Sequence, residues 1–134
     1  YIFSTNEEFT NKFSKNIEYI PPTLDLNVLT SLYLDADIFL FPSRAEGASV
    51  AILEALSSGL PVVAYDILGN RNLVDDSRNG YLCNSFDCEM LNNKLTHLIN
   101  SNELRKNMSL ESKIKYENEF SNKIYRQKLS YLFI

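Results

Sequence analysis

A strand–turn–helix–turn–strand unit between residues 37 and 66 constrains the fold of this chain more than any other segment. The first strand is expected over 37–41, where four apolar residues in a row are stopped by Pro42, a pattern typical of a strand buried on both faces. Pro61 can open the second strand, because a first residue need not donate a ladder hydrogen bond, and Val62–Tyr65 follows as another buried strand. Strands that alternate with helices indicate a parallel α/β sheet.

The segment between the two strands carries both the start and the stop signal of a helix. Ser49 is a good N-cap residue, and Gly59 suits the position just past the C-terminus. The apolar residues expected to cover the sheet are Val50, Ile52, Leu53, Leu56 and Leu60. The sequence therefore predicts a short helix packed on a parallel sheet.

Two carboxylates flank the start of this helix. Glu46 lies just before it and Glu54 about two turns into it, a separation of about 12 Å at helical rise. Residues 47–49 are small, so that a ligand could approach the backbone, and the unpaired N–H groups of the first turn favour an anion. Ionised carboxylates accept several hydroxyl hydrogen bonds at once. A diphosphate flanked by a sugar and a ribose, as in a nucleotide sugar, fits this pattern.

The two glutamates resemble the E-x7-E motif of the retaining glycosyltransferases with the GT-B fold, the large GT4-like group. Three segments around the motif match the family pattern in order and spacing: Ala36–Ser43, Glu54–Ala64 and Asn79–Leu82. The resemblance extends from about residue 1 to residue 130. It implies a Rossmann-like α/β domain with flanking helices, and residues 1–134 would be part of the C-terminal nucleotide-sugar-binding domain of such an enzyme.

The resemblance also implies roles for individual residues. Glu46 would be the catalytic glutamate that contacts the donor sugar near the reacting centre, and Glu54 would hold the ribose hydroxyls. The backbone of Ala48, Ser49 and Val50 would receive the distal phosphate, and Gly47 would let the donor approach the loop or would act as a hinge between the loop and the helix. Thr23 and Leu24 fall where the family often contacts the base. The scheme requires no cofactor and no metal, since the donor, a UDP-sugar, is itself a substrate.

The chain departs from the family pattern in two places. The family often has Gly-Phe-Gly after the first glutamate, where residues 47–49 read Gly-Ala-Ser, as in a recognisable subset of members. After Asp66, residues 69–72 resemble a Gly-Asn-Arg-Asp variant of surface-polysaccharide transferases, with Asn72 in place of the acid. Arg71 could contact a phosphate or an acceptor, or could pair on the surface.

Length and composition narrow the alternatives. A chain of 134 residues with 45% hydrophobic residues is expected to form one globular domain with a modest core. Its net charge of −4 makes nucleic acid an unfavourable partner. No apolar run is long enough to span a bilayer and the N-terminus does not read as a signal peptide, so we expect a cytoplasmic protein, with peripheral attachment at the inner face of the membrane left open.

Further elements follow from periodicity and breakers. The remaining expected strands are 1–4, 17–20 and 80–83. The remaining expected helices or turns are 6–14, 25–34, 70–75, 86–100, 103–119 and 121–133, so that helices dominate residues 86–134.

Several other residues that could carry chemistry have simpler explanations. His97 is expected to be a surface or satisfied histidine of a late helix, and Asp75-Asp76 to form a solvated turn. Cys83 and Cys88 are not spaced as a zinc pair and are expected to be free thiols. The apolar C-terminal stretch 131–134 could contact a membrane, although packing against an acceptor domain fits the family better.

The first hypothesis is therefore the donor-binding half of a retaining glycosyltransferase that transfers a sugar to a glycan or lipid-linked acceptor. In the family, a first β-α unit with phosphate-binding basic residues and an N-terminal acceptor domain precede the segment found here. We expect the chain alone to be inactive and marginally stable, or to have a rearranged or partnered sheet. A non-catalytic nucleotide-binding or docking module is the second hypothesis, and half of a sugar-nucleotide epimerase the third.

Overall fold

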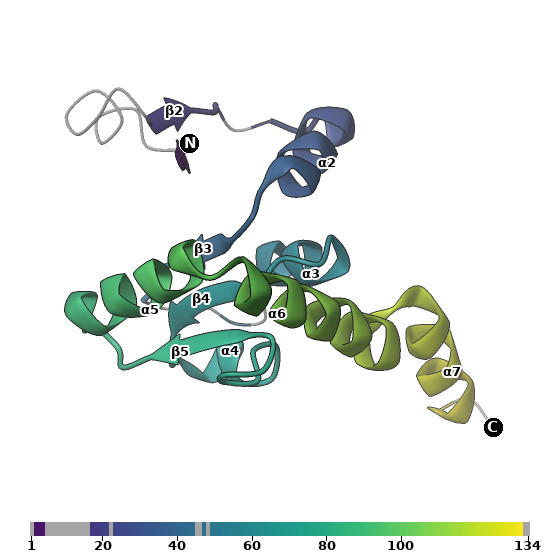
Figure 1. Ribbon diagram of the computed structural model, residues 1–134. Coiled ribbons are helices and arrows are strands. Elements are labelled where there is room, and N and C mark those ends of the chain that lie inside the picture. The colour runs from purple at the N-terminus through teal and green to yellow at the C-terminus, as the bar shows by residue number, and fades with distance from the viewer. Residues whose placement is uncertain (1, 5–16, 22, 45–46, 48, 133–134) are drawn as a thin grey trace. The chain divides into compact units, whose positions relative to one another are not determined.

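The computed structural model describes residues 2–4, 17–21, 23–44, 47 and 49–132. The chain divides into two compact units, unit 1 over Tyr1–Leu32 and unit 2 over Tyr33–Ile134 (Figure 1). None of the helices in the described ranges combines the length and apolar character needed to span a bilayer.

Unit 1 contains a pair of parallel strands and most of one helix. Strand β1 (Ile2–Ser4) pairs with β2 (Ile17–Tyr19), with Ile2 opposite Ile17. Helix α2 (Leu26–Asp35) starts after Asp25, whose carboxylate accepts a 2.9 Å hydrogen bond from the N–H of Asn27. Both strands and this helix were predicted from the sequence, whereas the helix predicted over 6–14 lies outside the described residues.

Unit 2 is built on a three-stranded parallel sheet. Its strands are β3 (Phe39–Phe41), β4 (Val62–Tyr65) and β5 (Gly80–Cys83), in the order β3-β4-β5. Phe39 lies opposite Val62, which lies opposite Gly80. All four residues of the central strand β4 are buried. The predicted parallel α/β architecture is thereby confirmed.

Helices cover both faces of this sheet (Figure 1). One face packs against α3 (Val50–Ser57), in a buried cluster formed by Ile52, Ala55, Leu56, Leu60, Val62, Ala64, Leu73 and Val74. The other face packs against α5 (Cys88–Asn100) and α6 (Asn102–Lys115), in a cluster formed by Val63, Tyr65, Tyr81, Cys83, Leu98 and Met108. The alternation of side chains along β4 supplies both clusters.

Two expectations about burial were wrong. Strand β3 is not buried on both faces, because it lies at an edge of the three-stranded sheet and Leu40 is 38% exposed. Val50 does not cover the sheet and is 66% exposed. The sheet-facing stripe of α3 consists of Ile52, Ala55 and Leu56, and at 100° per residue Val50 lies on the other side of the helix from Ile52.

The local start and stop signals agree closely with the structure. The Ser49 hydroxyl caps α3 by accepting a 3.3 Å hydrogen bond from the N–H of Ile52, and Gly59 has a positive φ of 78°. Asp87 caps α5 in the same way, through a 2.8 Å bond from Met90. The helix predicted to begin at residue 86 therefore begins at Cys88, because Phe86 has a φ of 67°.

The remaining helices differ from the prediction mainly in their bounds. The turn predicted over 70–75 is the short helix α4 (Leu68–Arg71), which starts directly after Ile67. Helix α6 passes into the π-helix η1 (Tyr116–Phe120), and α7 (Asn122–Leu132) follows. The predicted break near Ser121 is confirmed, since this residue has an extended backbone with ψ 154°.

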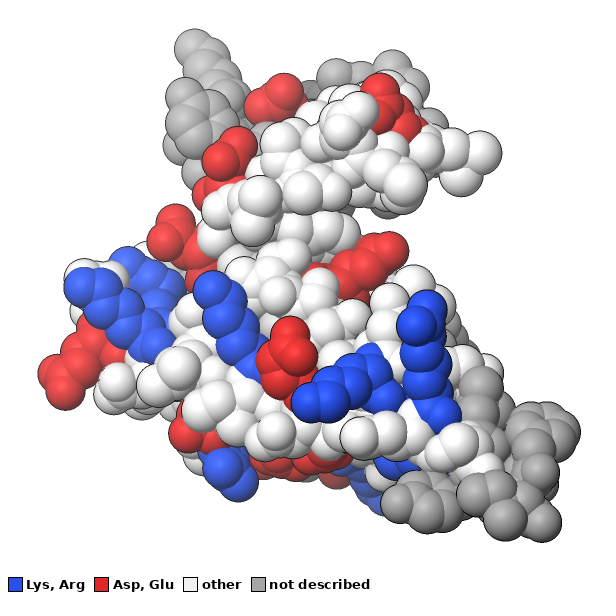
Figure 2. All heavy atoms as spheres, turned by 90° about the vertical axis from the view of Figure 1, so that its right-hand side faces the viewer, with Lys and Arg blue, Asp and Glu red and all other residues white. Residues whose placement is uncertain are grey.

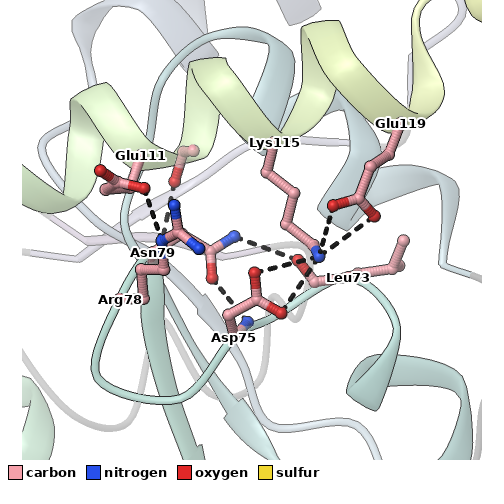
Figure 3. A network of polar contacts seen from close by, with 8 residues as sticks. Leu73, Asp75, Arg78, Asn79, Glu111, Lys115 and Glu119 are labelled. Atoms are coloured by element: carbon pink, nitrogen blue, oxygen red, sulfur yellow. Dashed lines mark hydrogen bonds and ion pairs between the residues drawn. The ribbon is translucent and has the colours of Figure 1, made fainter.

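A polar network ties α6 and η1 to the turn that precedes β5 (Figure 3). The Lys115 ammonium donates to both carboxylate oxygens of Asp75 at 3.1 Å and to Glu119 at 3.2 Å. Buried Asn79 donates to the carbonyl of Leu73 at 3.1 Å and accepts from the N–H of Asp75 at 2.7 Å. The network lies at the amino end of β5, opposite to the edge formed by the carboxyl ends of the strands.

The surface of unit 2 in Figure 2 carries basic and acidic side chains interspersed with one another rather than a field of one sign. The mixture of charges on this face is consistent with the modest net charge of −4 over the whole chain.

Candidate functional site

The carboxyl ends of the three parallel strands of unit 2 place their following residues along one edge of the sheet. The loop after β3 leads into α3, Asp66 follows β4, and Asn84 follows β5. Ser85 joins two of these loops, since its hydroxyl donates a 3.2 Å hydrogen bond to the carbonyl of Asp66. This edge carries most of the predicted site residues.

Ser49 and Val50 form the start of α3, as the sequence predicted. Ser49 is buried, and its hydroxyl is used for the N-cap bond to Ile52. Val50 is exposed at the first helical position. Because the remaining first-turn N–H groups of an α-helix have no acceptor within the helix, this turn presents donors and a positive dipole end to the loop before it.

Gly47 lies in that loop. Among the described residues, a Cβ added at this position would meet nothing within 4 Å, and the residue is exposed. The described surroundings therefore do not themselves require a glycine here. Glu46 and Ala48, the other loop residues predicted to contact the donor, lie outside the described residues.

Glu54 is exposed on α3 and is held by a tyrosine. The Tyr33 hydroxyl donates a 2.9 Å hydrogen bond to Glu54 Oε2 and lies 3.4 Å from the carbonyl of Ala51. Burial raises the pKa of the Tyr33 phenol, and the hydrogen bond and charge of Glu54 raise it further. The phenol therefore stays protonated at ordinary pH and remains the donor of this bond.

Arg71 pairs with Asp66 on the surface, one of the alternatives that the sequence left open. Its Nε donates to Asp66 Oδ1 at 2.6 Å and its Nη2 to Oδ2 at 3.3 Å. The neighbouring Asn70 is fully buried and donates a 2.9 Å bond to the carbonyl of Tyr65 at the end of β4. Helix α4 thus fixes the geometry of the Asp66 loop.

Thr23 and Leu24 belong to unit 1. The Thr23 hydroxyl accepts a 3.0 Å bond from the N–H of Asp25, and Leu24 is 97% exposed. Their assignment to the base of the donor stays a prediction from the resemblance.

Two features around the candidate site escaped sequence reasoning. The contact of Tyr33 with Glu54 was not predicted, because nothing in the pattern distinguishes this tyrosine from a residue that only packs in the core. The Arg44 guanidinium lies 4.9 Å from the centroid of the Phe86 ring, so that the loop after β3 contacts the loop after β5. The positive φ of Phe86, unusual for an aromatic residue, had no signal in the sequence.

The residues with simpler explanations have structural partners. The Tyr81 hydroxyl lies 3.1 Å from His97 Nδ1. Asp75 pairs with Lys115, and Asp76 accepts a 2.9 Å bond from the N–H of Leu82. Cys83 and Cys88 are free, as predicted. Within the described ranges, no group of three or more histidine, cysteine, aspartate or glutamate side chains is arranged to hold a metal ion.

Comparison with known sequences identifies relatives over most of the chain. Residues 12–115 match the family model of glycosyl transferases group 1. An uncharacterised glycosyltransferase of Haemophilus influenzae is 33% identical over 113 residues, which cover 84% of this chain and 31% of that protein. The poly(glycerol-phosphate) alpha-glucosyltransferase of Bacillus subtilis is 32% identical over 133 residues, 92% of this chain and 19% of that protein. The chain thus spans a third or less of these relatives.

Solved structures agree with the sequence comparison. The C-terminal domain of the group 1 glycosyl transferase LpcC from Francisella tularensis superposes with a TM-score of 0.74 at 27% identity, over 81% of this chain and 56% of that one. HepE from Anabaena, solved in complex with UDP, superposes with a TM-score of 0.76 at 23% identity, over 87% of this chain and 32% of that one. By sequence and by fold, this chain belongs to the group 1 family of glycosyl transferases.

Proposed function

We propose that this protein provides the donor-binding part of a retaining glycosyltransferase that takes its sugar from a UDP-sugar. The acceptor would be a hydroxyl of a glycan or of a lipid-linked glycan. The proposal concerns the carboxyl edge of β3 and β4, where loop residue Gly47, the start of α3 and Glu54 follow one another.

The observation that carries the proposal is the arrangement of α3. Its capped N-terminus is preceded by Gly47, beside which the described residues leave free space, and Glu54 is exposed about one turn further along the helix. The N-terminus would receive the distal phosphate of the donor, and the Glu54 carboxylate would accept hydrogen bonds from the ribose hydroxyls. Both interactions fit one nucleoside diphosphate, and Glu46 is the residue that we propose to contact the transferred sugar.

The chemistry follows from where charge develops. As the bond between the anomeric carbon and the diphosphate breaks, negative charge grows on the diphosphate, and the donors of the first turn of α3 would stabilise it. Glu46 would orient the sugar and stabilise positive character near its anomeric carbon. The acceptor hydroxyl oxygen then bonds to that carbon in place of the diphosphate oxygen, and its proton passes to the departing diphosphate. The original configuration at the carbon would be retained.

Relatives support the choice of donor and the acceptor class. HepE from Anabaena has been solved with UDP and with UDP-glucose. A capsular polysaccharide biosynthesis glycosyltransferase, CapM of Staphylococcus aureus, is 26% identical over 103 residues, 77% of this chain and 27% of that protein. A UDP-sugar and a cell-surface glycan are therefore the first ligands to test.

Calorimetric titration of the protein with UDP tests the donor site. We expect saturable binding that weakens about tenfold or more in Glu54→Ala, because the ribose hydroxyls lose a charged acceptor. Glu103→Ala, which removes another exposed glutamate, on α6, is the matched control and should bind UDP as the wild type does. Absence of UDP binding by a folded wild-type protein would favour the docking-module hypothesis instead.

Turnover tests the catalytic assignment. In an active enzyme that contains this domain, Glu46→Ala should abolish transfer of the sugar while UDP binding persists, because UDP lacks the transferred sugar that Glu46 would contact. Wild-type turnover in this variant would remove Glu46 from the mechanism.

A further inference from the structure

The Tyr33 side chain is held at both of its ends. Its ring lies 5.7 Å from the ring of Phe39, centroid to centroid, and Phe39 in turn stacks on Phe41 at 5.9 Å. Its hydroxyl donates to Glu54 Oε2 at 2.9 Å. Because the ring packs against strand β3 and against the cluster under α3, the phenol oxygen is fixed relative to the sheet.

Glu54 has no such support of its own. It is exposed on α3, and its carboxylate ends a chain of rotatable bonds that would otherwise sample several rotamers in water. The bond from Tyr33 occupies Oε2, and the described part of the chain shows no hydrogen-bond partner for Oε1. One oxygen is thus anchored, and the other belongs to an exposed side chain and has no partner among the described residues.

We propose that Tyr33 is a positioning residue for nucleotide recognition: its hydroxyl anchors Glu54 Oε2, so that Oε1 is presented to the ribose hydroxyls of the donor. The inference rests on the proposed function, because it assumes that Glu54 binds the ribose. It adds a residue that makes no contact with the ligand itself and acts through the carboxylate.

The effect of this anchor is to reduce the cost of ordering Glu54 when the ligand binds. Without the hydroxyl, the free carboxylate rotates, and binding must immobilise it. The free energy needed to immobilise one such side chain corresponds to about a three- to tenfold loss of affinity. The loss applies only to ligands whose hydroxyls use Glu54.

The test compares two ligands in two proteins. UDP and 2′,3′-dideoxy-UDP, which lacks both ribose hydroxyls, are titrated into wild-type protein and into Tyr33→Phe. This variant keeps the ring against Phe39 and removes only the hydroxyl. We expect Tyr33→Phe to bind UDP about three- to tenfold more weakly and dideoxy-UDP unchanged, so that the preference for UDP shrinks.

Tyr81→Phe is the matched control. It also keeps a packed ring and removes a phenol hydroxyl that bonds a polar side chain, His97, at 3.1 Å. We expect it to retain the wild-type preference for UDP over dideoxy-UDP.

The outcomes distinguish a wrong role for Tyr33 from a wrong assignment of Glu54 to the ribose. An undiminished preference for UDP in Tyr33→Phe would overturn the inference and leave the donor site intact, and so would an equal loss for both ligands, which marks a purely structural role. A wild-type protein that does not distinguish the two ligands would overturn the assignment of Glu54 to the ribose, and the inference with it.

A double-mutant cycle gives a second, independent readout. If Tyr33 acts through Glu54, Tyr33→Phe added to Glu54→Ala should cause no further loss of UDP affinity. Additive losses would show that the tyrosine contributes by another route and would overturn the inference.

Discussion

The ammonium of Lys115, on α6, donates to both carboxylate oxygens of Asp75 at 3.1 Å, although the lysine side chain is only 9% exposed (Figure 3). The same ammonium also pairs with Glu119 at 3.2 Å. A nearly buried lysine is rare unless it is paired. Here it links the last turn of α6 to the turn that starts β5.

Lys115→Met should therefore destabilise the protein. The two carboxylates are 42% and 48% exposed, so water can partly solvate them once the lysine is gone. We expect a loss of about 1–3 kcal/mol in the free energy of unfolding, below the value for a fully buried pair. Urea denaturation measures it.

The matched control is Arg78→Met. Arg78 pairs with Glu111 at 2.7 Å in the same region, but its side chain is 65% exposed. We expect this variant to lose less than about 1 kcal/mol. Equal losses in the two variants would show that burial of Lys115 adds nothing to its pairing.

Local signals explain how much of the fold could be predicted from the sequence. The Ser49 cap, the positive φ of Gly59 and the strands of unit 2 all depend on residues near each other in the chain. Burial of Lys115 could not be predicted in this way, because its partner Asp75 lies 40 positions away. Only the tertiary crossing of α6 over the amino end of β5 brings the two together.

In the candidate site, too, local features could be predicted from the sequence and tertiary contacts could not. The exposed Glu54 and the capped start of α3 follow from helix periodicity and capping. The contact with Tyr33 does not, because the hydrogen bond joins residues 21 positions apart on different helices. Arg71 was assigned to several possible partners because its spacing to Asp66 permits a pair without requiring one.

The glycines of unit 2 should respond differently to alanine. At Gly59, the φ of 78° disfavours any side chain, and an added Cβ would also meet the flexible Lys113 side chain. We expect Gly59→Ala to cost about 1–2 kcal/mol of stability. At Gly80 the Cβ would meet the backbone carbonyl of Val62, which cannot yield, and the cost should be about 2–4 kcal/mol.

Gly47→Ala is the control for both, because a Cβ there meets none of the described residues within 4 Å. Its stability should stay within about 0.5 kcal/mol of the wild type. If the proposed donor site is right, this variant instead weakens UDP binding. Thermal unfolding with and without UDP separates the two effects, and a large stability loss in Gly47→Ala would contradict the open geometry of the loop.

The stability of the protein should be sensitive to a negative charge at residue 70, even when the size of the side chain hardly changes. Its Nδ2 donates to the carbonyl of Tyr65 at 2.9 Å in a fully buried position, and its Oδ1 has no partner among the described residues. Asn70→Asp would place a carboxylate against that carbonyl, with an expected loss of about 2–4 kcal/mol. Asn72→Asp, at an exposed neighbour, should change stability by less than about 0.5 kcal/mol. Similar urea midpoints for the two variants would show that a carboxylate at the buried position 70 costs no more than one at the exposed position 72.

The two thiols should differ in reactivity. Cys88 is exposed at the start of α5, whereas Cys83 is fully buried in β5. With an aromatic disulfide reagent, we expect one thiol to react quickly in the folded protein and the second only on unfolding. Cys88→Ser should remove the fast phase and leave the slow one. A fast phase that persists in this variant would show that Cys83 is accessible in the folded state.

Stability should also fall at alkaline pH, in part through Cys83. Burial raises the pKa of this thiol in the folded protein. Above the pKa of an unfolded thiol, about 8.5, the unfolded chain loses its proton while the folded chain keeps it, so that unfolding becomes easier as pH rises. The stabilisation is complete below that pH and disappears through the folded pKa. Cys83→Ala should flatten the decline of the urea midpoint that begins above about pH 8.5, although the variant is less stable throughout. Burial also raises the pKa of Tyr81, so a decline of the urea midpoint at still higher pH should remain in Cys83→Ala. If the first decline, directly above the pKa of an unfolded thiol, keeps its slope in this variant, Cys83 is not the source of that decline.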